Sequence, residues 1–328
     1  MKAWVVKDQT QLGLAQLQLL DVAIPEPQAD ELQVKVQAVG LNPVDYKIID
    51  SGVTAWQYPH TIGIDVAGEV SAVGPNVTGF KRGDRVFYHS DLRRNGALAA
   101  YNVTLAASVA KLPDALSYVQ GAAILCANLT AYQALMRKVN LTNAQTILIH
   151  AGGGAVGLAA LQLAKQLGLR TITTVSARKR ALVEKVGADT IIDYHQEDVT
   201  AAVLKATEGR GVDVSLNTIG GSELAADTDR MAYNGQIVAI GDGMPPHFDF
   251  DDRALALIRS GLGGVYCSND PVQIHDLAVM AGAVAKLVIA DKLDPLIGEV
   301  QPFDQVPAAL QTIKSGRNVG KLVIQVTA

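Results

Sequence analysis

The chain has 328 residues, which is long enough for two domains with separate hydrophobic cores. Hydrophobic residues make up 49% of it and charged residues 18%, as in an ordinary globular protein. The net charge of −4 argues against a nucleic-acid partner, which usually needs a basic face. Two cysteines are too few for a disulfide scaffold and suit a reducing compartment, so we predict a cytoplasmic protein.

Neither a signal peptide nor a membrane span is predicted. The first eight residues lack the apolar run of a secretory signal. The stretch from Val139 to Ala164 is almost free of charge, but its asparagines, histidine and glycines favour a buried strand, turn and helix. We therefore expect a protein without a membrane partner.

The first 125 residues predict a β-rich domain. Residues 32–39 and 66–74 alternate between apolar and polar side chains, which is the pattern of half-buried strands. Residues 81–87 predict a turn that leads into another strand. Prolines, which suit turns and strand ends better than helices, are spread through this part at Pro25, Pro27, Pro43, Pro59 and Pro75.

A glycine-rich stretch then predicts a dinucleotide-binding turn. A short apolar run begins at Thr146, and a helical pattern follows the glycines. The spacing Gly-x-Gly-x-x-Gly between a strand and a helix allows a tight turn, a close approach of the pyrophosphate and close packing of the helix. The helix N-terminus then faces the phosphates. The residues expected to contact the cofactor here are Gly152, Gly154, Ala155, Val156 and Gly157.

Strands and helices alternate after this loop, which predicts a doubly wound parallel sheet of the Rossmann type over residues 126–266. The expected strands are 171–175, 190–193, 212–217, 236–240 and 263–266, and the expected helices are 129–139, 178–186, 199–207, 223–231 and 252–260. The tail breaks this rhythm with a helix at 272–290, a strand at 297–302, a helix at 304–315 capped by Asp304, and a strand at 321–326. We assign residues 267–328 to the first domain.

The ends of the predicted parallel strands nominate further cofactor residues, because ligands bind at the carboxyl ends of such strands. The strand at 171–175 is followed by Ser176, Arg178 and Lys179, and the first carboxylate is as distant as Glu184. A hydroxyl and cations there favour the 2′-phosphate of NADP over NAD; the alternative is a basic, solvated helix start. Later strand ends nominate Asn217, which has turn capping as an alternative, together with Ile240, Gly241 and Val265.

Five motifs in this order resemble the medium-chain dehydrogenase/reductase superfamily, and within it the zinc-free, ζ-crystallin-like quinone oxidoreductases. They span residues 40–46, 63–68, 79–86, 126–132 and 151–157. The resemblance covers essentially the whole chain. It implies a GroES-like β-rich domain that holds substrate, a Rossmann domain that holds NADPH, and a homodimer. It also places Asn42 and Thr130 near nicotinamide and substrate, and Tyr194 by the 2′-phosphate. Lys321, which follows the turn at residues 316–320, is expected to return to the cleft and bind the cofactor.

Three of these assignments have plainer alternatives: a stabilised Asn-Pro turn for Asn42, an exposed strand-end side chain for Tyr194, and a solvated strand start for Lys321. The implied reaction is hydride transfer from the nicotinamide to a quinone. Tyr46 and Asp45 are candidates to orient the substrate or relay a proton, although no partner base is visible. The alternatives are a reductase of α,β-unsaturated ketones or aldehydes, and a non-catalytic NADPH-binding or redox-sensing protein.

One departure from the zinc-dependent relatives predicts that no metal is bound. Where those enzymes have a cysteine and a histidine as ligands, this chain has Asn42 and Ile64, and only Cys126 matches a ligand position. One ligand of three cannot hold catalytic zinc. Residues 90–96 also lack the cysteines of the structural zinc lobe.

Overall fold

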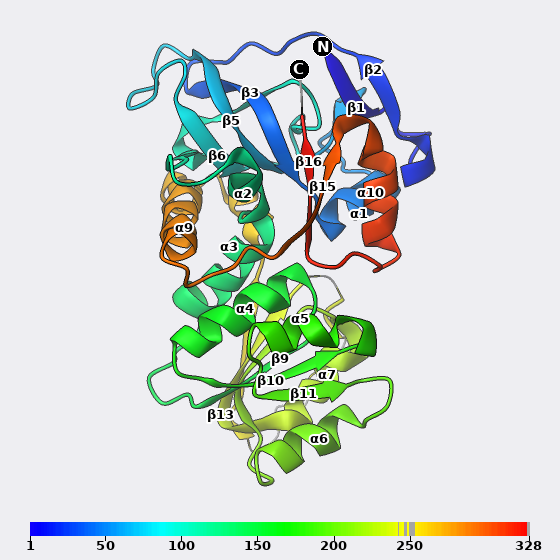
Figure 1. Ribbon diagram of the computed structural model, residues 1–328, viewed down its shortest axis with the longest axis vertical. Coiled ribbons are helices and arrows are strands. Elements are labelled where there is room, and N and C mark those ends of the chain that lie inside the picture. Colours follow the sequence, from blue (N-terminus) through cyan, green and yellow to red (C-terminus); the bar gives the residue numbers. More distant parts are fainter. Residues whose placement is uncertain (242, 246–247, 249–252, 327–328) are drawn as a thin grey trace. The chain divides into compact units, whose positions relative to one another are not determined.

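The computed structural model describes residues 1–241, 243–245, 248 and 253–326. The chain forms two compact units, of which the first comprises Met1–Leu129, Gly263–Asp291 and Pro295–Ala328. The second comprises Thr130–Leu262 and Lys292–Asp294. The chain passes between the units at 129/130 and 262/263, a few residues from the boundaries expected at 125/126 and 266/267, and again at 291/292 and 294/295, because Lys292–Asp294 belong to the second unit. In Figure 1 the first unit carries the colours of both chain ends, because the C-terminal segments belong to it.

The second unit is a six-stranded parallel sheet in the order β11-β10-β9-β12-β13-β14. This is the doubly wound dinucleotide-binding order, so the predicted Rossmann class is confirmed. Its strands are β9 (Thr146–Ile149), β10 (Arg170–Val175), β11 (Thr190–Asp193), β12 (Val212–Asn217), β13 (Met231–Ile240) and β14 (Ala256–Ser260). Its helices include α4 (Ala155–Gln166), α5 (Arg180–Lys185), α6 (Val199–Ala206) and α7 (Gly221–Arg230).

Burial on both faces explains why these segments are strands. All four residues of β9 are buried, and Leu148 packs with Ile172 of β10 and Ile237 of β13 in one apolar cluster. Parallel strands covered by helices on both faces favour such continuous runs of β-branched and aliphatic residues. Because all six strands are parallel, their carboxyl ends lie on the same side of the sheet. The predicted cofactor residues directly follow these strand ends.

Two elements predicted at the end of this sheet are wrong. The segment expected to be a helix at 252–260 contains strand β14, and residues 251–252 lie outside the described residues. Ala256 to Ser260 pair in parallel with Gln236 to Ile240 of β13, so this edge of the sheet overrides the helical spacing of the apolar residues. The strand expected at 263–266 is instead the 3-10 turn Leu262–Gly264 followed by α8 (Val265–Ser268).

The first unit is built on a mixed sheet in the order β15-β16-β3-β5-β6-β8, with β7 also paired to β3, and on a small sheet in the order β2-β1-β4. The strands are β1 (Lys2–Val6), β2 (Gln18–Asp21), β3 (Glu31–Gly40), β4 (His60–Thr61), β5 (Asp65–Val73), β6 (Arg85–His89), β7 (Tyr101–Leu105), β8 (Ala110–Lys111), β15 (Ile297–Pro302) and β16 (Lys321–Gln325). This GroES-like arrangement confirms the predicted class of the domain. The antiparallel pairing of β16 with β3 is what brings the C-terminal tail into it.

The helices of this unit are α1 (Pro43–Ser51), α2 (Tyr118–Ala123), α8, α9 (Pro271–Ile289) and α10 (Val306–Lys314), and α3 (Cys126–Gln133) begins in it and continues into the second unit. The residue that caps α10 is Gln305, while the expected cap Asp304 lies in the preceding 3-10 turn. Among the described residues α9 is the one helix long and apolar enough to cross a membrane by length and composition alone. It packs against β6 and β8 and buries Leu277 and Val284, so packing inside the unit explains its apolar character.

Candidate functional site

The glycine loop joins β9 to α4 in the second unit. A side chain on Gly152 would collide with Oγ1 of Thr173, and a Cβ on Gly157 would come 2.6 Å from the carbonyl oxygen of Ala151. Packing alone therefore requires glycine at these two positions. Gly154 differs, because its nearest neighbour would be that same carbonyl oxygen, at 3.2 Å, and its φ of −85° suits any residue. The fold alone explains Gly152 and Gly157, whereas the glycine at 154 matches a ligand that approaches the backbone.

The start of α4 is prepared for an anion. Gly154 is its N-cap, no side chain caps it, and its first turn carries no acidic residue. The first N–H groups of a helix have no partner within the helix, and the helix dipole adds positive charge there. The backbone of Ala155, Val156 and Gly157 therefore fits a pyrophosphate.

Basic residues lie beside this loop at the end of β10. A Cβ on Gly153 would be 2.6 Å from Cβ of Lys179, so the Lys179 stem packs directly against the glycine loop. Burial, and secondarily the neighbouring charge of Arg178, lower the pKa of Lys179. Arg178 is exposed, and Ser176 caps the 3-10 turn that carries both cations. A second anion near the loop would relieve the crowding of these positive charges.

Tyr194 follows the neighbouring strand. Val175 of β10 is in register with Asp193 of β11, so Ser176 and Tyr194 both follow adjacent strand ends. The Tyr194 side chain is exposed and lies 4.3 Å from the His195 ring, measured between ring centroids. Four of the predicted cofactor residues thus follow the carboxyl ends of the neighbouring strands β10 and β11: Ser176, Arg178, Lys179 and Tyr194.

A buried polar network, here called the Asp227 cluster, lies under the ends of β9 and β12. It comprises His150, Ser215, Asn217, Asp227 and Arg230. The Asp227 carboxylate binds Nε2 of His150 at 2.8 Å and Nη1 of Arg230 at 3.0 Å, and it accepts hydrogen bonds from Ser215 and Asn217. Burial alone would raise the pKa of Asp227, but His150 and these hydrogen-bond donors hold it below its ordinary value.

Asn217 therefore has a structural role in this cluster. Its Nδ2 donates to Asp227 at 2.8 Å, and its Oδ1 accepts the backbone N–H groups of Ile219 and Gly220. This is the turn-capping alternative for Asn217. Ile240 and Gly241 do stand at the carboxyl end of β13, beside β12.

Two other nominated residues have different settings. Val265 does not end a strand, because it begins helix α8 in the first unit, and its nomination from a strand end is wrong. Thr130 is buried within α3, at the residue where the chain enters the second unit.

The first unit holds a second buried polar network, the Lys321 cluster, made of Asn42, Asp45, Asp65 and Lys321. Asn42 follows β3 and precedes α1, Asp65 begins β5, and Lys321 begins β16. Nζ of Lys321 donates to Oδ1 of Asn42 at 2.6 Å and to Oδ2 of Asp65 at 3.0 Å. Nδ2 of Asn42 donates to the same Asp65 oxygen at 2.8 Å. Lys321 is only 3% exposed, so the alternative of a solvated strand start is wrong.

Asp45 joins this cluster through the backbone. Its Oδ2 accepts the N–H of Asn42 at 2.7 Å, which forms a capping box at the start of α1. Its Oδ1 is buried without a hydrogen-bond partner among the described residues. Burial, and to a smaller extent the charge of Asp65, raise the pKa of Asp45 to about 7.

The structure does not bring Tyr46 into this cluster. Its ring is partly buried against the core of the first unit, and Nζ of Lys314 on α10 lies 5.9 Å from the ring centroid. Lys314 also forms an ion pair with Asp50 at 2.6 Å. The role predicted for Tyr46 in catalysis therefore stays a prediction without a contact to the Lys321 cluster.

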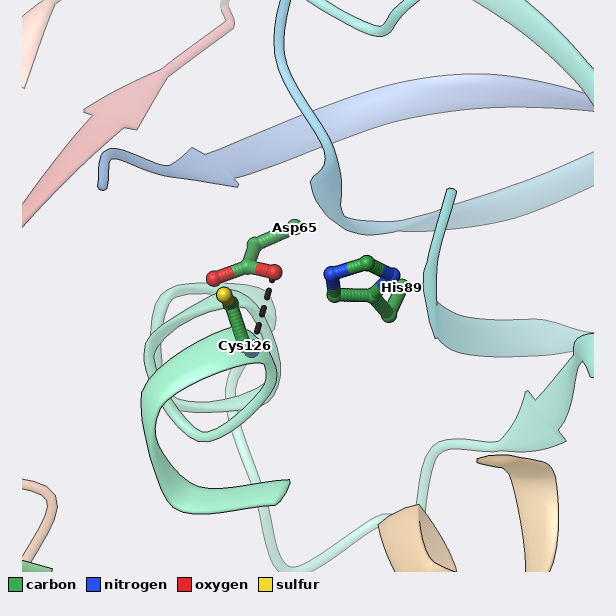
Figure 2. A group of neighbouring side chains, drawn as sticks. All are labelled: Asp65, His89 and Cys126. Atoms are coloured by element: carbon green, nitrogen blue, oxygen red, sulfur yellow. Dashed lines mark hydrogen bonds between the residues drawn. The ribbon is translucent and has the colours of Figure 1, made fainter. Parts of the chain in front are cut away.

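The residues at the relatives' zinc-ligand positions are unsuited to that zinc site. Ile64 is buried and has no donor atom, and Oδ1 of Asn42 already accepts Lys321. However, Cys126 does not stand alone, because Asp65, His89 and Cys126 each place one possible ligand atom within 4.8 Å of the others. Figure 2 shows a ring nitrogen of His89 directed at the Asp65 carboxylate. The sequence did not point to Asp65 and His89. They lie side by side because β5 and β6 pair at these two residues, and this pairing cannot be read from a single sequence.

Two family models match the chain. The alcohol dehydrogenase GroES-like domain matches residues 28–114, and the zinc-binding dehydrogenase model matches residues 186–324. Among curated relatives, the quinone oxidoreductase of Homo sapiens is 30% identical over 311 residues, which cover 93% of this chain and 92% of that protein. That of Sus scrofa is 31% identical over 308 residues, with the same coverage.

Solved structures agree along the full length. A quinone oxidoreductase of Pseudomonas syringae superposes with a TM-score of 0.89 at 28% identity, covering 99% of this chain and 100% of that one. The Escherichia coli quinone oxidoreductase complexed with NADPH has a TM-score of 0.84 at 26% identity, covering 99% of both chains. A putative zinc-dependent alcohol dehydrogenase of Rhizobium etli also superposes, with a TM-score of 0.89 at 28% identity, covering 100% of this chain and 98% of that one.

These matches cover both units and the loop and clusters described above. They also join the chain to enzymes rather than to a binding module. The chain therefore belongs to the medium-chain dehydrogenase/reductase superfamily, as an enzyme homologous to its quinone oxidoreductases.

Proposed function

We propose that this protein is an NADPH-dependent reductase of quinones that transfers hydride without the help of a metal ion. The observation that carries the proposal is the similarity to quinone oxidoreductases over 93% of the chain. The homologue from Escherichia coli was crystallised with NADPH, which supports the same cofactor here.

The second unit offers groups suited to the pyrophosphate of NADPH and to its 2′-phosphate. The loop at Gly154 and the uncapped start of α4 would receive the pyrophosphate. Arg178 and Lys179, with the hydroxyl of Ser176, would receive the 2′-phosphate that distinguishes NADPH from NADH. Bound NADPH supplies the hydride, and the protein contributes binding, orientation and electrostatics.

The first unit fits the orientation of a polar, electron-poor substrate. Asn42 is held at both ends of its amide by Lys321, Asp65 and the carbonyl oxygen of Gly40. Lys321 uses two bonds to Asn42 and Asp65, so its ammonium has one further N–H that can stabilise negative charge on a reduced oxygen. Asp45 holds the backbone of Asn42 and acts as a positioning residue.

Metal independence follows from the chemistry of the acceptor. A simple alcohol or ketone needs a Lewis acid to lower its pKa or to polarise its carbonyl. A quinone is electron-poor enough to accept hydride without one. The amide of Asn42 and the apolar side chain of Ile64 at the relatives' ligand positions are consistent with this acceptor class.

A substrate panel tests the proposal. NADPH oxidation would be followed with 1,4-benzoquinone, 9,10-phenanthrenequinone and a series of 2-alkenals. We expect turnover with at least one quinone at a kcat/KM above that of every 2-alkenal. Turnover of the alkenals alone would assign the protein to the enone and aldehyde reductases instead.

A further inference from the structure

The side chains of Asp65, His89 and Cys126 meet inside the first unit, from segments far apart in the sequence. Asp65 at the start of β5 pairs across the sheet with His89 at the end of β6. Cys126 begins α3, and its backbone N–H donates to Oδ1 of Asp65 at 2.9 Å, as Figure 2 shows. The carboxylate, imidazole and thiol atoms all lie within 4.8 Å of one another.

The surroundings of this group leave ligand capacity unused. His89 is only 2% exposed, and its Nδ1 has no hydrogen-bond partner among the described residues. Figure 2 shows the other ring nitrogen, Nε2, facing the Asp65 carboxylate, and no hydrogen bond joins the two side chains. Buried polar atoms are nearly always satisfied in native proteins, so an unsatisfied imidazole beside a carboxylate and a thiol needs an explanation.

A soft divalent cation would explain why a thiol, an imidazole and a carboxylate lie together in the interior. Sulfur, imidazole nitrogen and carboxylate oxygen are the three ligand types that Zn²⁺ takes, and three protein ligands leave a fourth position for water. Two carboxylates, Asp45 and Asp65, are buried beside one ammonium, that of Lys321.

We propose that Asp65, His89 and Cys126 form a binding site for a thiophilic divalent cation such as Zn²⁺ or Cd²⁺, and that quinone reduction does not require its occupation. On binding, the Cys126 S–H bond breaks, its proton leaves to solvent, and a metal–sulfur bond forms. The ligand set shares only Cys126 with the one expected from the zinc-dependent relatives. Because Lys321 already pairs with Oδ2 of Asp65, the cation binds reversibly and is removed by EDTA.

The test uses the full chain, freed of metal with EDTA, exchanged into chelator-free buffer and titrated with CdCl₂. Ultraviolet absorption reports the thiolate-to-cadmium charge transfer, and calorimetry reports the stoichiometry. We expect one Cd²⁺ per chain together with a charge-transfer band. Cys126→Ser should abolish the band, while Cys267→Ser, at the other and exposed cysteine, should leave it unchanged.

A second pair of variants tests the imidazole without touching the thiol. His89→Gln should weaken Cd²⁺ binding at least tenfold, whereas His195→Gln, at an exposed histidine, should have no effect. Equal Cd²⁺ binding by His89→Gln and the wild type, or a band that survives in Cys126→Ser, would overturn the site. Absence of binding leaves the quinone reductase proposal untouched, because that proposal is judged by the activity of EDTA-treated protein.

Discussion

The two buried polar clusters of this chain differ in how completely their atoms are paired. In the Asp227 cluster of the second unit, the central carboxylate binds a histidine, an arginine, a hydroxyl and an amide. In the first unit, the two buried side-chain atoms that lack a partner among the described residues are Oδ1 of Asp45 and Nδ1 of His89. Asp45 belongs to the Lys321 cluster, and His89 pairs across the sheet with Asp65, another member of it.

We interpret this difference as one between a structural role for the Asp227 cluster and the functional role proposed for the Lys321 cluster. A fully satisfied network fixes the ends of β9 and β12 and rigidifies the support of the glycine loop. An unsatisfied buried atom costs free energy, and each one in a native protein calls for an explanation, such as a bound ion, a ligand or a part in the reaction. On this account the second unit binds through backbone and strand-end residues outside its cluster, whereas the first unit works through the cluster itself.

The largest expected effect concerns the strand-end residues of the second unit. Each hydrogen bond to a charged group contributes about 1.5–3 kcal/mol, so Arg178 and Lys179 together would favour NADPH over NADH by about 10²–10⁴-fold. Replacing both with alanine should collapse most of this preference and leave NADH kinetics nearly unchanged. The measurement is kcat/KM for each cofactor. Equal use of NADH by the wild-type protein would refute the assignment of these residues to the 2′-phosphate.

Breaking the paired cluster should act on stability. Asp227→Ala removes the buried carboxylate that binds both His150 and Arg230, while Glu223 still pairs with Arg230. Breaking a buried pair costs about 3–5 kcal/mol, so we expect a loss near the lower end of that range. Urea unfolding measures this cost directly. Asp229→Ala, at an exposed position of the same helix, is the matched control and should change stability by less than about 0.5 kcal/mol. If the two variants unfold alike, the Asp227 cluster does not hold this unit together.

Replacing Asp45, whose carboxylate is incompletely paired, should change how the free energy of unfolding depends on pH. Because the fold raises the pKa of Asp45 to about 7, the stabilising effect of its protonated form is present at low pH and is lost as the pH rises through that value. Asp45→Asn cannot ionise. Its stability relative to the wild type should therefore improve by about 3 kcal/mol from about pH 5 to about pH 8. A difference that stays constant over this range would contradict the buried setting of Asp45.

The smallest of these effects separates two glycines of one loop. Gly154→Val should fold, because little of the chain surrounds that position, but should lose NADPH affinity by about tenfold or more, or about 1.4 kcal/mol and upwards. Gly157→Val is the contrasting variant, since its side chain would meet the backbone of Gly152, and it should lose stability. Binding is measured by NADPH fluorescence and stability by thermal unfolding. NADPH binding that survives Gly154→Val would place the cofactor elsewhere.

Local patterns predicted the second unit well and the first unit's site only in part. The glycine loop and the strand end at Ser176 lie within short segments whose spacing carries their meaning. Asn42 and Lys321 were nominated separately, but their meeting depends on β16 pairing with β3 at Gly40, and Asp65 enters because β5 pairs there too. Such long-range register is invisible in a single sequence, which is also why His89 was missed.

In residues 252–266, by contrast, the local pattern predicted the wrong type of secondary structure. Their apolar spacing favours a helix and then a strand, and the structure has the reverse order for the described part. The hydrogen bonds offered by the edge of β13 outweigh the local preference, since strand formation depends strongly on context. The strand end from which Val265 was inferred as a cofactor residue does not exist, while its contact with the cofactor stays a prediction.

The most direct test of the account measures quinone reduction by protein stripped of metal. After prolonged EDTA treatment, with zinc content checked by elemental analysis, the protein should still oxidise NADPH with 1,4-benzoquinone at the rate of untreated protein. It should also oxidise ethanol negligibly in either state. Activity that disappears with the metal and returns on addition of one Zn²⁺ per chain would contradict hydride transfer without a metal ion.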